Sequence, residues 1–399
     1  MRQLQVASLA DVCLLVTDGT HDTPKRVDEG FPLIKAKEIV GGAIDFDSCD
    51  QISETEHLRV IARSKPEYGD TLFAHIGASL GEAALVKTHR PFSIKNIALF
   101  KPNPDVIDGC YLYYLVISPE FQDLAKNTKT GSAQPFLSLG HLRSHRIHFH
   151  ERLEDQRRIA YILSAYDDLI ENNLRRIKIL EEIAQNLYRE WFVKFRFPGH
   201  ANVRMVDSPL GETPEGWDIV KVGELLEKIK RKKKIKKQDY QLEGEIPVVD
   251  QGKDFVGGFT CDPDALHNDP LPIIVFGDHT RILKFIDFPF ACGADGTQLL
   301  RSNTSRMPMS LFYSVLKSID LSSFAYARHF KFLKEQEVLL PDEGSAEAYA
   351  DFVEPLRDHI RSLMRKNNNL RQTRDLLLPK LISGELDVST LPIDIGEAA

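Results

Sequence analysis

The stretch IAYILSAYDDLIENNLRRIKILEEIAQNLYREW, residues 159–191, decides the fold of this chain. Apolar side chains recur in it at alternating steps of four and three, from Ile159 to Trp191. This spacing sets them in one narrow stripe along a helix, and only a partner helix can bury such a stripe. A second stretch, YADFVEPLRDHIRSLMRKNNNLRQTRDLLLPKL at residues 349–381, has the same spacing. The sequence therefore predicts two long helices that pack against each other.

The register of this helix pair follows from two asparagines. If the stripes run antiparallel, Asn173 lies opposite Asn367 and each amide gains a hydrogen-bonding partner, whereas a shift by one heptad would still match apolar residues. In this register Tyr166 faces Arg374, which permits a cation–π contact. The alternative is that both asparagines contact solvent at a frayed seam. The predicted seam comprises Ile159, Leu163, Tyr166, Ile170, Asn173, Ile177, Leu180, Ile360, Leu363, Asn367, Leu370 and Leu377.

Two prolines bear on the second helix. Pro355 lies inside its stripe, so the helix is expected either to start near Glu354 or to kink there. Pro379 is expected to mark the far end, with Gly384 beyond it.

A region of mixed structure precedes each helix. In residues 1–150, short apolar runs separated by Gly, Pro, Asp and Asn predict strands at 31–34, 71–76, 83–86, 97–100 and 146–150, while 111–117 fits a strand or a helix. Residues 200–216 end in a segment with Pro209, Gly211, Pro214 and Gly216, which predicts a linker.

The region that starts at Trp217 repeats the first one. Gly77 matches Gly277 at the ends of similar apolar runs, and the offset is larger near Pro32 and Pro247. A drifting offset is what loop deletions in one copy of an old duplication would leave. The sequence thus predicts globular domain, long helix, globular domain, long helix.

The composition limits the class of protein. A chain of 399 residues suits two or three domains, and a net charge of −7 argues weakly against a general polyanion binder. Five scattered cysteines without a C-x-x-C pair favour buried thiols in a reducing compartment. No signal pattern or membrane-length apolar stretch is found, so a cytoplasmic protein is expected.

Catalytic motifs are missing from the sequence. There is no G-x-x-x-x-G-K-[ST] phosphate loop, no Asn-Pro-Pro-Tyr or Asp-Pro-Pro-Tyr run and no G-x-G-x-x-G that opens a helix. The strongest hint of a metal site is the set His141, His145, His148 and His150, but a strand at 146–150 puts only the last two on one face. We therefore predict polar or DNA-facing histidines and no metal or cofactor. The glycine-rich residues 77–81 fit a hairpin turn better than a phosphate site.

Basic and amide side chains suggest DNA binding. Residues 228–237 are almost entirely Lys and Arg, which indicates phosphate contact or else a solvated loop. Paired donors and acceptors are what base reading requires, although any such side chain can instead cap a turn. The predicted phosphate contacts are Lys35, Lys37, Lys126, Lys129, Lys230, Lys232 and Lys233. The predicted base contacts are Ser132, Gln134, Gln251, His279, Arg281 and Gln298.

Several of these segments resemble one known family. Residues 156–173 (QRRIAYILSAYDDLIENN), 187–192 (LYREWF), 197–199 (FPG), 214–217 (PEGW) and 378–385 (LPKLISGE) resemble the conserved regions of type I restriction–modification specificity subunits. The segments DGTH at 18–21 and TGSAQ at 130–134 look like segments frequent in that family's target recognition domains. The resemblance covers nearly the whole chain and is more specific in the helices than elsewhere.

The resemblance implies an α+β fold with two α/β target recognition domains separated by a pair of long antiparallel coiled-coil helices. The expected boundaries are 1–150 and 217–344 for these domains, 151–195 and 345–384 for the helices, 196–216 for the linker and 385–399 for a C-terminal tail. It also implies a non-catalytic subunit that reads a bipartite asymmetric site on double-stranded DNA, one half with each domain. The alternative is a scaffold whose two domains bind proteins, and a free-standing nuclease or methylase lacks the motifs.

The resemblance further implies two methyltransferase (modification) subunits as partners and, through them, nuclease-translocase (restriction) subunits. Apolar residues on the outer faces of the first helix exceed what a two-helix seam needs. They serve either to dock these partners or to pack against the domains of the chain itself. These residues are Ile162, Leu169, Leu174 and Ile179.

Overall fold

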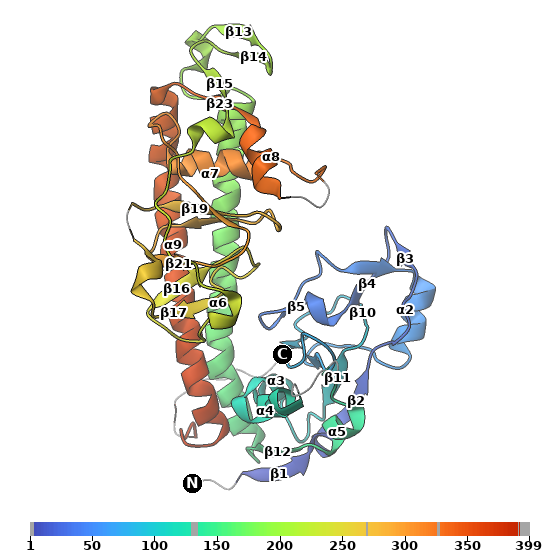
Figure 1. The fold of residues 1–399 in the computed structure, drawn as a ribbon. Coiled ribbons are helices and arrows are strands. Elements are labelled where there is room, and N and C mark those ends of the chain that lie inside the picture. Colours follow the sequence, from blue (N-terminus) through green and yellow to red (C-terminus); the bar gives the residue numbers. More distant parts are fainter. Residues whose placement is uncertain (1–3, 129–134, 269, 325–327, 390, 392–399) are drawn as a thin grey trace. The chain divides into compact units, whose positions relative to one another are not determined.

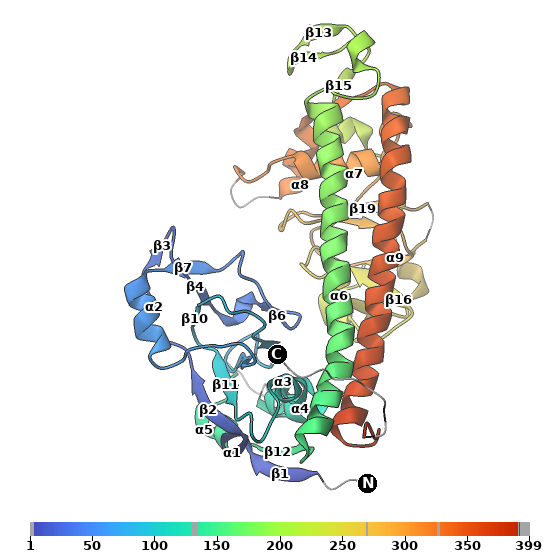
Figure 2. The same cartoon turned by 180° about the vertical axis from the view of Figure 1, so that it is seen from behind.

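The computed structural model describes residues 4–128, 135–268, 270–324, 328–389 and 391. The chain divides into two compact units, the first made of Met1–Asn173 and Arg365–Ala399 and the second of Leu174–Met364. Both long helices, α6 (Leu153–Tyr188) and α9 (Glu343–Ile382), have residues in each unit. Within each unit their segments lie side by side (Figure 1 and Figure 2).

Among its described residues, the first unit contains two four-stranded sheets and two strand pairs. The antiparallel sheet has the order β2-β11-β8-β9 and the mixed sheet β10-β4-β7-β3, while β1 pairs with β12 and β5 with β6. The strands are β1 Gln5–Ser8, β2 Cys13–Asp18, β3 Arg26–Val27, β4 Phe31–Ile34, β5 Ile39–Val40, β6 Ala43–Ile44, β7 Asp50–Ile52, β8 Thr71–Phe73, β9 Ala83–Leu85, β10 Ser93–Ile94, β11 Ala98–Pro102 and β12 Arg146–Phe149. The helices are α1 Leu9–Val12, α2 Glu54–Ile61, α3 Gly109–Ile117, α4 Pro119–Thr128 and α5 Leu139–Ser144.

Both faces of the antiparallel sheet are buried. Since the side chains of a strand alternate between the two faces, neighbouring residues pack into different cores. Phe73 and Phe100 join the core that contains α3 and the start of α6, whereas Leu72 and Leu99 pack with residues of the mixed sheet. The segment that fitted strand or helix is helix α3, and the Asp108 side chain caps it by accepting from the Tyr111 N–H at 2.9 Å.

The second unit repeats this pairing of strands. Strand β19 lies between β20 and β22, antiparallel to both, as β8 lies between β9 and β11. Strand β16 pairs parallel with β21 and antiparallel with β17, as β4 does with β10 and β7, and β15 pairs with β23 as β1 does with β12. Pro32 and Pro247 are each the second residue of an equivalent strand, β4 and β16, which supports an internal duplication. The match of Gly77 with Gly277 does not hold, because Gly77 lies in the turn after β8 with a φ of +82°, whereas Gly277 is the last residue of β19.

The bounds of the second unit's elements are as follows. The strands are β13 Met205–Ser208, β14 Gly211–Pro214, β15 Asp218–Lys221, β16 Ile246–Val249, β17 Gly258–Thr260, β18 Leu266–His267, β19 Ile273–Gly277, β20 Leu283–Ile286, β21 Phe290–Cys292, β22 Thr297–Leu300 and β23 Glu337–Leu340. The helices are α7 Met309–Ser318 and α8 His329–Glu335. The segment predicted as a plain linker contains the antiparallel hairpin β13–β14.

In the first unit, the helices are joined by polar contacts within an apolar seam. Asn173 Nδ2 donates to Asn367 Oδ1 at 2.8 Å, and Asn367 Nδ2 donates to the Ile170 carbonyl at 3.4 Å. Apolar seam residues join the core of this unit; they include Ile159, Leu163, Leu377 and Leu381. In the second unit the Tyr349 hydroxyl donates to the Ala184 carbonyl at 3.0 Å, and Ile360 and Leu363 are buried.

Two details of the helices can be compared with expectation. Arg374 forms an ion pair with the Asp167 carboxylate and not a cation–π contact with Tyr166, because a full negative charge within reach attracts the guanidinium more strongly than a ring face. Of the two possibilities raised by Pro355, a start near Glu354 is excluded, and the observed start lies two residues before the expected boundary at 345. The second helix begins at Glu343, where Asp342 Oδ1 accepts from the Ser345 N–H at 2.9 Å, and it runs through Pro355.

The far end of α9 lies within the expected bounds of 345–384. The helix continues past Pro379 to Ile382, and Gly384 follows with a φ of +72°. In the described ranges, no helix is both long enough and apolar enough to cross a membrane.

Candidate nucleic-acid interface

The basic run in the second unit is attached to the domain surface by its two isoleucines. Ile235 is buried, and its backbone accepts from the Ala294 N–H at 2.7 Å and donates to the Cys292 carbonyl at 3.1 Å. Ile229 packs against a neighbouring apolar cluster. The Lys and Arg side chains between them are therefore displayed on a fixed segment, which is what phosphate contacts need.

The lysines of this run differ in their contacts. Lys233 Nζ lies 2.5 Å from Asp262 Oδ2, a contact that raises the pKa of Lys233, and Lys234 Nζ donates to the Thr297 carbonyl at 2.9 Å. Lys230 and Lys232 are exposed, and their ammonium groups have no ion-pair partner among the described residues. Like Lys228, Arg231, Lys236 and Lys237 of the same run, they are available to a polyanion.

Three loops of the second unit meet at Gln251. Gln251 Oε1 accepts from the His279 N–H at 3.1 Å, and Gln251 Nε2 donates to the Asp295 carbonyl at 2.9 Å. The Gln251 carbonyl also accepts from the Thr280 hydroxyl at 2.7 Å. Of the two roles considered for Gln251, these bonds support capping of turns, because both ends of its amide are already engaged by backbone.

The other predicted base contacts of this unit lie nearby in sequence or across a strand pair. His279 is exposed, whereas Arg281 Nη1 donates to the Leu321 carbonyl at 3.2 Å and Arg281 has a φ of +62°. Gln298 is half-buried in β22, opposite Phe276 of β19. The structure thus brings Gln251 and His279 together and holds the Arg281 side chain against another segment.

In the first unit, the predicted phosphate contacts Lys35 and Lys37 are already paired. Lys35 forms an ion pair with Asp50, and Lys37 Nζ lies 3.1 Å from Glu38 Oε1. The Lys35 contact is the largest cause of a lowered Asp50 pKa. Of the others, Lys129, Ser132 and Gln134 lie outside the described residues; Lys126 lies in α4.

Sequence reasoning missed a polar network around the DGTH segment. Asp18 is buried, forms an ion pair with Arg63, and its Oδ2 lies 3.0 Å from His21 Nε2. His21 Nδ1 lies 2.9 Å from Asn96 Oδ1. Gly19 is required between them, because a Cβ there would lie 2.1 Å from the Ile94 carbonyl oxygen. The signal available in the sequence was the motif itself.

His75 interacts electrostatically with this network. It is buried, which lowers its pKa, and the charges of Asp18 and His21 act on it. Its Nδ1 donates to the Leu137 carbonyl at 2.9 Å, so Nε2 is left as an acceptor that has no partner among the described residues.

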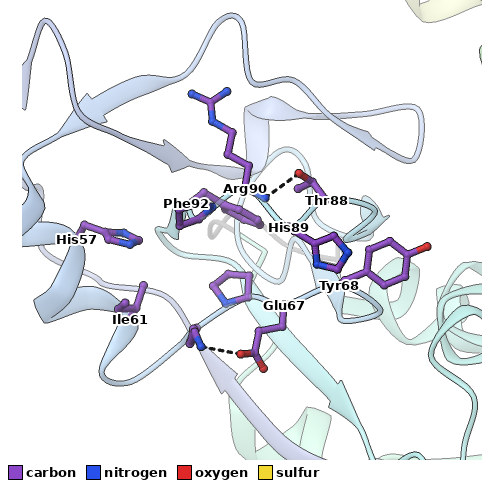
Figure 3. Close-up of a pocket in the computed structure, with 11 residues that line it drawn as sticks. His57, Ile61, Glu67, Tyr68, Thr88, His89, Arg90 and Phe92 are labelled. Carbon is purple, nitrogen blue, oxygen red and sulfur yellow. Dashed lines mark hydrogen bonds and ion pairs between the residues drawn. The ribbon is translucent and has the colours of Figure 1, made fainter. Parts of the chain in front are cut away.

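A pocket of the first unit has both aromatic and ionic walls (Figure 3). Tyr68 and His89 stack with their ring centroids 5.0 Å apart, and the ring of His57 points into the pocket from α2. Glu67 contacts Lys65 at 2.8 Å and Lys101 at 2.9 Å, and these two cations lower its pKa to about 2. Lys65 is paired with Glu67, whereas Arg90, which also lines the pocket, lies over the ring of Phe46 and has no ion-pair partner among the described residues.

The four histidines considered for a metal do not converge. His148 Nδ1 lies 2.7 Å from Glu120 Oε1, and the buried His150 has Nε2 2.9 Å from the Leu381 carbonyl. Across the parts of the chain that the structure describes, no group of three or more His, Cys, Asp or Glu side chains is placed to hold a metal ion. The 77–81 segment forms the turn between the antiparallel strands β8 and β9.

The outer apolar residues of α6 divide into two groups. Ile162 is partly buried and packs against the core of the first unit, which is the second of the two roles considered for these residues. Leu169 is about half exposed in the first unit, and Leu174, Ile179 and Ile183 are similarly exposed in the second.

Comparisons with known proteins agree on one family. Residues 1–183 match the family described as Type I restriction modification DNA specificity domain. The chain is similar to a putative type I restriction enzyme MjaX specificity subunit of Methanocaldococcus jannaschii, with 24% identity covering 97% of this chain and 94% of that protein. It is also similar to the MjaIX specificity subunit of the same organism, with 25% identity covering 90% of each.

A solved structure supports the fold. The type I restriction–modification system S subunit from M. genitalium superposes with a TM-score of 0.53 and 16% identity, covering 97% of each chain. At that identity the likeness concerns the fold alone.

Proposed function

We propose that this chain, which belongs to the family of type I restriction–modification specificity subunits, is the DNA-recognition subunit of such a complex. It is a non-catalytic subunit, and the enzymatic activities reside in other subunits. The observation that carries the proposal is the similarity to named specificity subunits along almost the whole chain, together with the DNA specificity family match over residues 1–183.

Residues 1–150 and 217–344 are, in this proposal, two target recognition domains that each read one half of a bipartite asymmetric site on double-stranded DNA. The repeated strand pairing of the two units supports two copies of one reading device. Different loops on one scaffold then read different sequences, because loops tolerate change while the strands keep the fold. Such DNA binding fits a cytoplasmic protein.

The helices at 151–195 and 345–384 are proposed to form an antiparallel coiled coil that sets the unread spacer between the half-sites. The Asn173–Asn367 pair supports this assignment, since a buried polar pair at one seam position fixes the register. Helix α6 has 36 residues and so extends about 54 Å, from a rise of about 1.5 Å per residue.

The same helix is proposed to dock two methyltransferase subunits, which in turn bring the nuclease-translocase subunits. Its exposed apolar residues in the second unit, Leu174, Ile179 and Ile183, support this role, because a helix that only paired with α9 would not need them. Replacing Ile179 with Glu should abolish co-purification of the methyltransferase partner while the chain keeps its helical circular dichroism. Retained co-purification would reject this surface.

The experiment that tests the proposed function separates DNA reading from protein scaffolding. The tagged full chain is purified from its own cells, co-purifying proteins are identified, and binding to mixed genomic duplexes is titrated at several salt concentrations. A DNA-recognition subunit brings down a methyltransferase and binds duplexes with an affinity that falls steeply as salt rises. A two-headed protein scaffold would co-purify with other proteins, and its affinity for DNA would show no such dependence on salt.

A further inference from the structure

Three loop tips of the second unit lie at the ends of neighbouring strands. Residues 250–254 follow β16, residues 278–281 lie in the connection between β19 and β20, and residues 293–296 join β21 to β22. Gln251 belongs to the first loop and is bonded to both of the others. It is thus the one side chain among these contacts that ties all three loops together.

The geometry at Gln251 requires an amide. Its Oε1 accepts from a backbone N–H at His279 while its Nε2 donates to a backbone carbonyl at Asp295. A carboxylate of the same reach would accept at both ends, and a methionine would do neither. The approach is close, because a Cβ on Gly296 would lie 2.7 Å from Gln251 Nε2 and 2.6 Å from His279 Cδ2. Gly296, at a φ of +70°, therefore allows the loops to close around the amide.

The loop that carries Gln251 is itself anchored by a buried lysine. Lys284 in β20 is buried, and its ammonium donates to the carbonyls of Asp250 at 2.8 Å and Asp254 at 2.5 Å, one at each end of the loop. Burial lowers the pKa of Lys284. Asp250 Oδ1 also accepts from the Gly252 N–H at 2.8 Å. Because this loop is anchored, the bonds of Gln251 fix the positions of the other two loops.

The side chains that these loops expose are suited to reading bases. His279 and Lys253 are exposed, and neither side chain has a hydrogen-bond or ion-pair partner among the described residues. An imidazole and an ammonium offer donors that can meet N7 and O6 of a guanine or a phosphate beside it. A reading side chain discriminates between bases only if its backbone is held in place.

We infer that Gln251 is a positioning residue for the half-site read by the second domain, acting through the backbone of His279 rather than by touching a base. The inference rests on the proposed function. It assigns to the amide the role of aligning the 278–281 and 293–296 loops over the DNA. Loss of the amide should therefore relax the sequence preference of one half-site and leave general DNA affinity and the other half-site unchanged.

The test is selection of random duplexes by the full chain, comparing the unaltered protein with Gln251→Ala, Gln251→Glu and Gln336→Ala. Gln336 is a matched control: it is also a half-buried glutamine of the second unit bonded to a backbone carbonyl, that of Phe332 in α8 at 3.1 Å. Thermal unfolding of each variant shows whether the second unit stays folded. Gln251→Glu keeps the acceptor for the His279 N–H and loses only the donor to Asp295.

We expect Gln251→Ala to reduce preference for the second half-site by about tenfold, the discrimination associated with roughly one base pair. Gln251→Glu should fall between it and the unaltered chain, and Gln336→Ala should select the original site. The first half-site and the salt dependence of binding should not change. An unchanged second half-site in a folded Gln251→Ala variant would overturn the inference, as would equal loss at both half-sites. Failure of the unaltered chain to select any sequence would instead overturn the proposed function on which the inference rests.

Discussion

The hydrogen bond between Asn173 and Asn367 makes an asymmetric prediction for the stability of the first unit. Asn367 is 1% exposed, whereas Asn173 is half-buried. Asn173→Leu therefore leaves a carbonyl oxygen of Asn367 buried without its donor, at a cost of about 2–3 kcal/mol. Asn367→Leu leaves an amide that water can partly reach, at a cost of about 1 kcal/mol. The double variant should lose much less than the sum.

The assay is a double-mutant cycle in urea. Far-UV circular dichroism follows the helices, and the fluorescence of Trp191 and Trp217, the only two tryptophans, reports the second unit alone. We expect a coupling free energy of about 1–2 kcal/mol between the two sites in the transition of the first unit.

A control cycle uses the adjacent exposed pair Asn172→Leu and Asn368→Leu, which should show no coupling. Additive losses for Asn173 and Asn367, with a double variant as unstable as the sum of the single ones, would refute the reasoning.

Three further predictions concern charge and length. Changing Lys230 and Lys232 to Gln should weaken binding to all duplexes alike and reduce the salt slope by about 0.9 for each phosphate that the variant no longer neutralises; an unchanged slope would mean that the run is only solvated. Adding one heptad to each long helix lengthens it by about 10 Å. Random-duplex selection should then show a spacer longer by about three base pairs if the helices lie along the DNA, fewer if they are inclined, with both half-sites unchanged. Because Lys65 and Lys101 lower the folded-state pKa of Glu67 from 4.5 to about 2, its stabilising effect is complete above pH 4.5 and disappears as the pH falls from 4.5 to about 2. Replacing Glu67 with Gln should make the free energy of unfolding, measured in urea, less dependent on pH in that window. The change should be small because Glu67 is half exposed, and an unchanged pH profile would contradict the assignment.

The helices could be predicted from the sequence because their signal is local and periodic. A stripe with steps of three and four, and one asparagine in each copy, suffices to suggest both the helices and their register. The effect of Pro355 could not, because a proline inside a helical pattern can indicate a new start or a kink, and only the structure places the cap at Asp342, before the expected boundary at 345.

The DNA-facing residues were much harder to infer. Nothing local distinguishes Gln251, whose amide bonds to loops 28 and 44 residues away, from a glutamine free to read a base. The network of Asp18, His21 and Asn96 depends in the same way on residues 75 positions apart. A helical wheel of the pair alone places Ile162 on the outer face, and only the core of the first unit covers it.

The central claim, that one chain reads two separate DNA sequences, is tested most directly by selection of random duplexes with the unaltered full chain. Sequencing of the bound duplexes should give two short conserved segments of different sequence, separated by a fixed number of unconserved base pairs. Binding of the selected duplex should exceed that of a duplex with either segment scrambled by about tenfold for each mismatched base pair. Recovery of a single continuous segment, a variable spacer, or no enriched sequence would contradict the account.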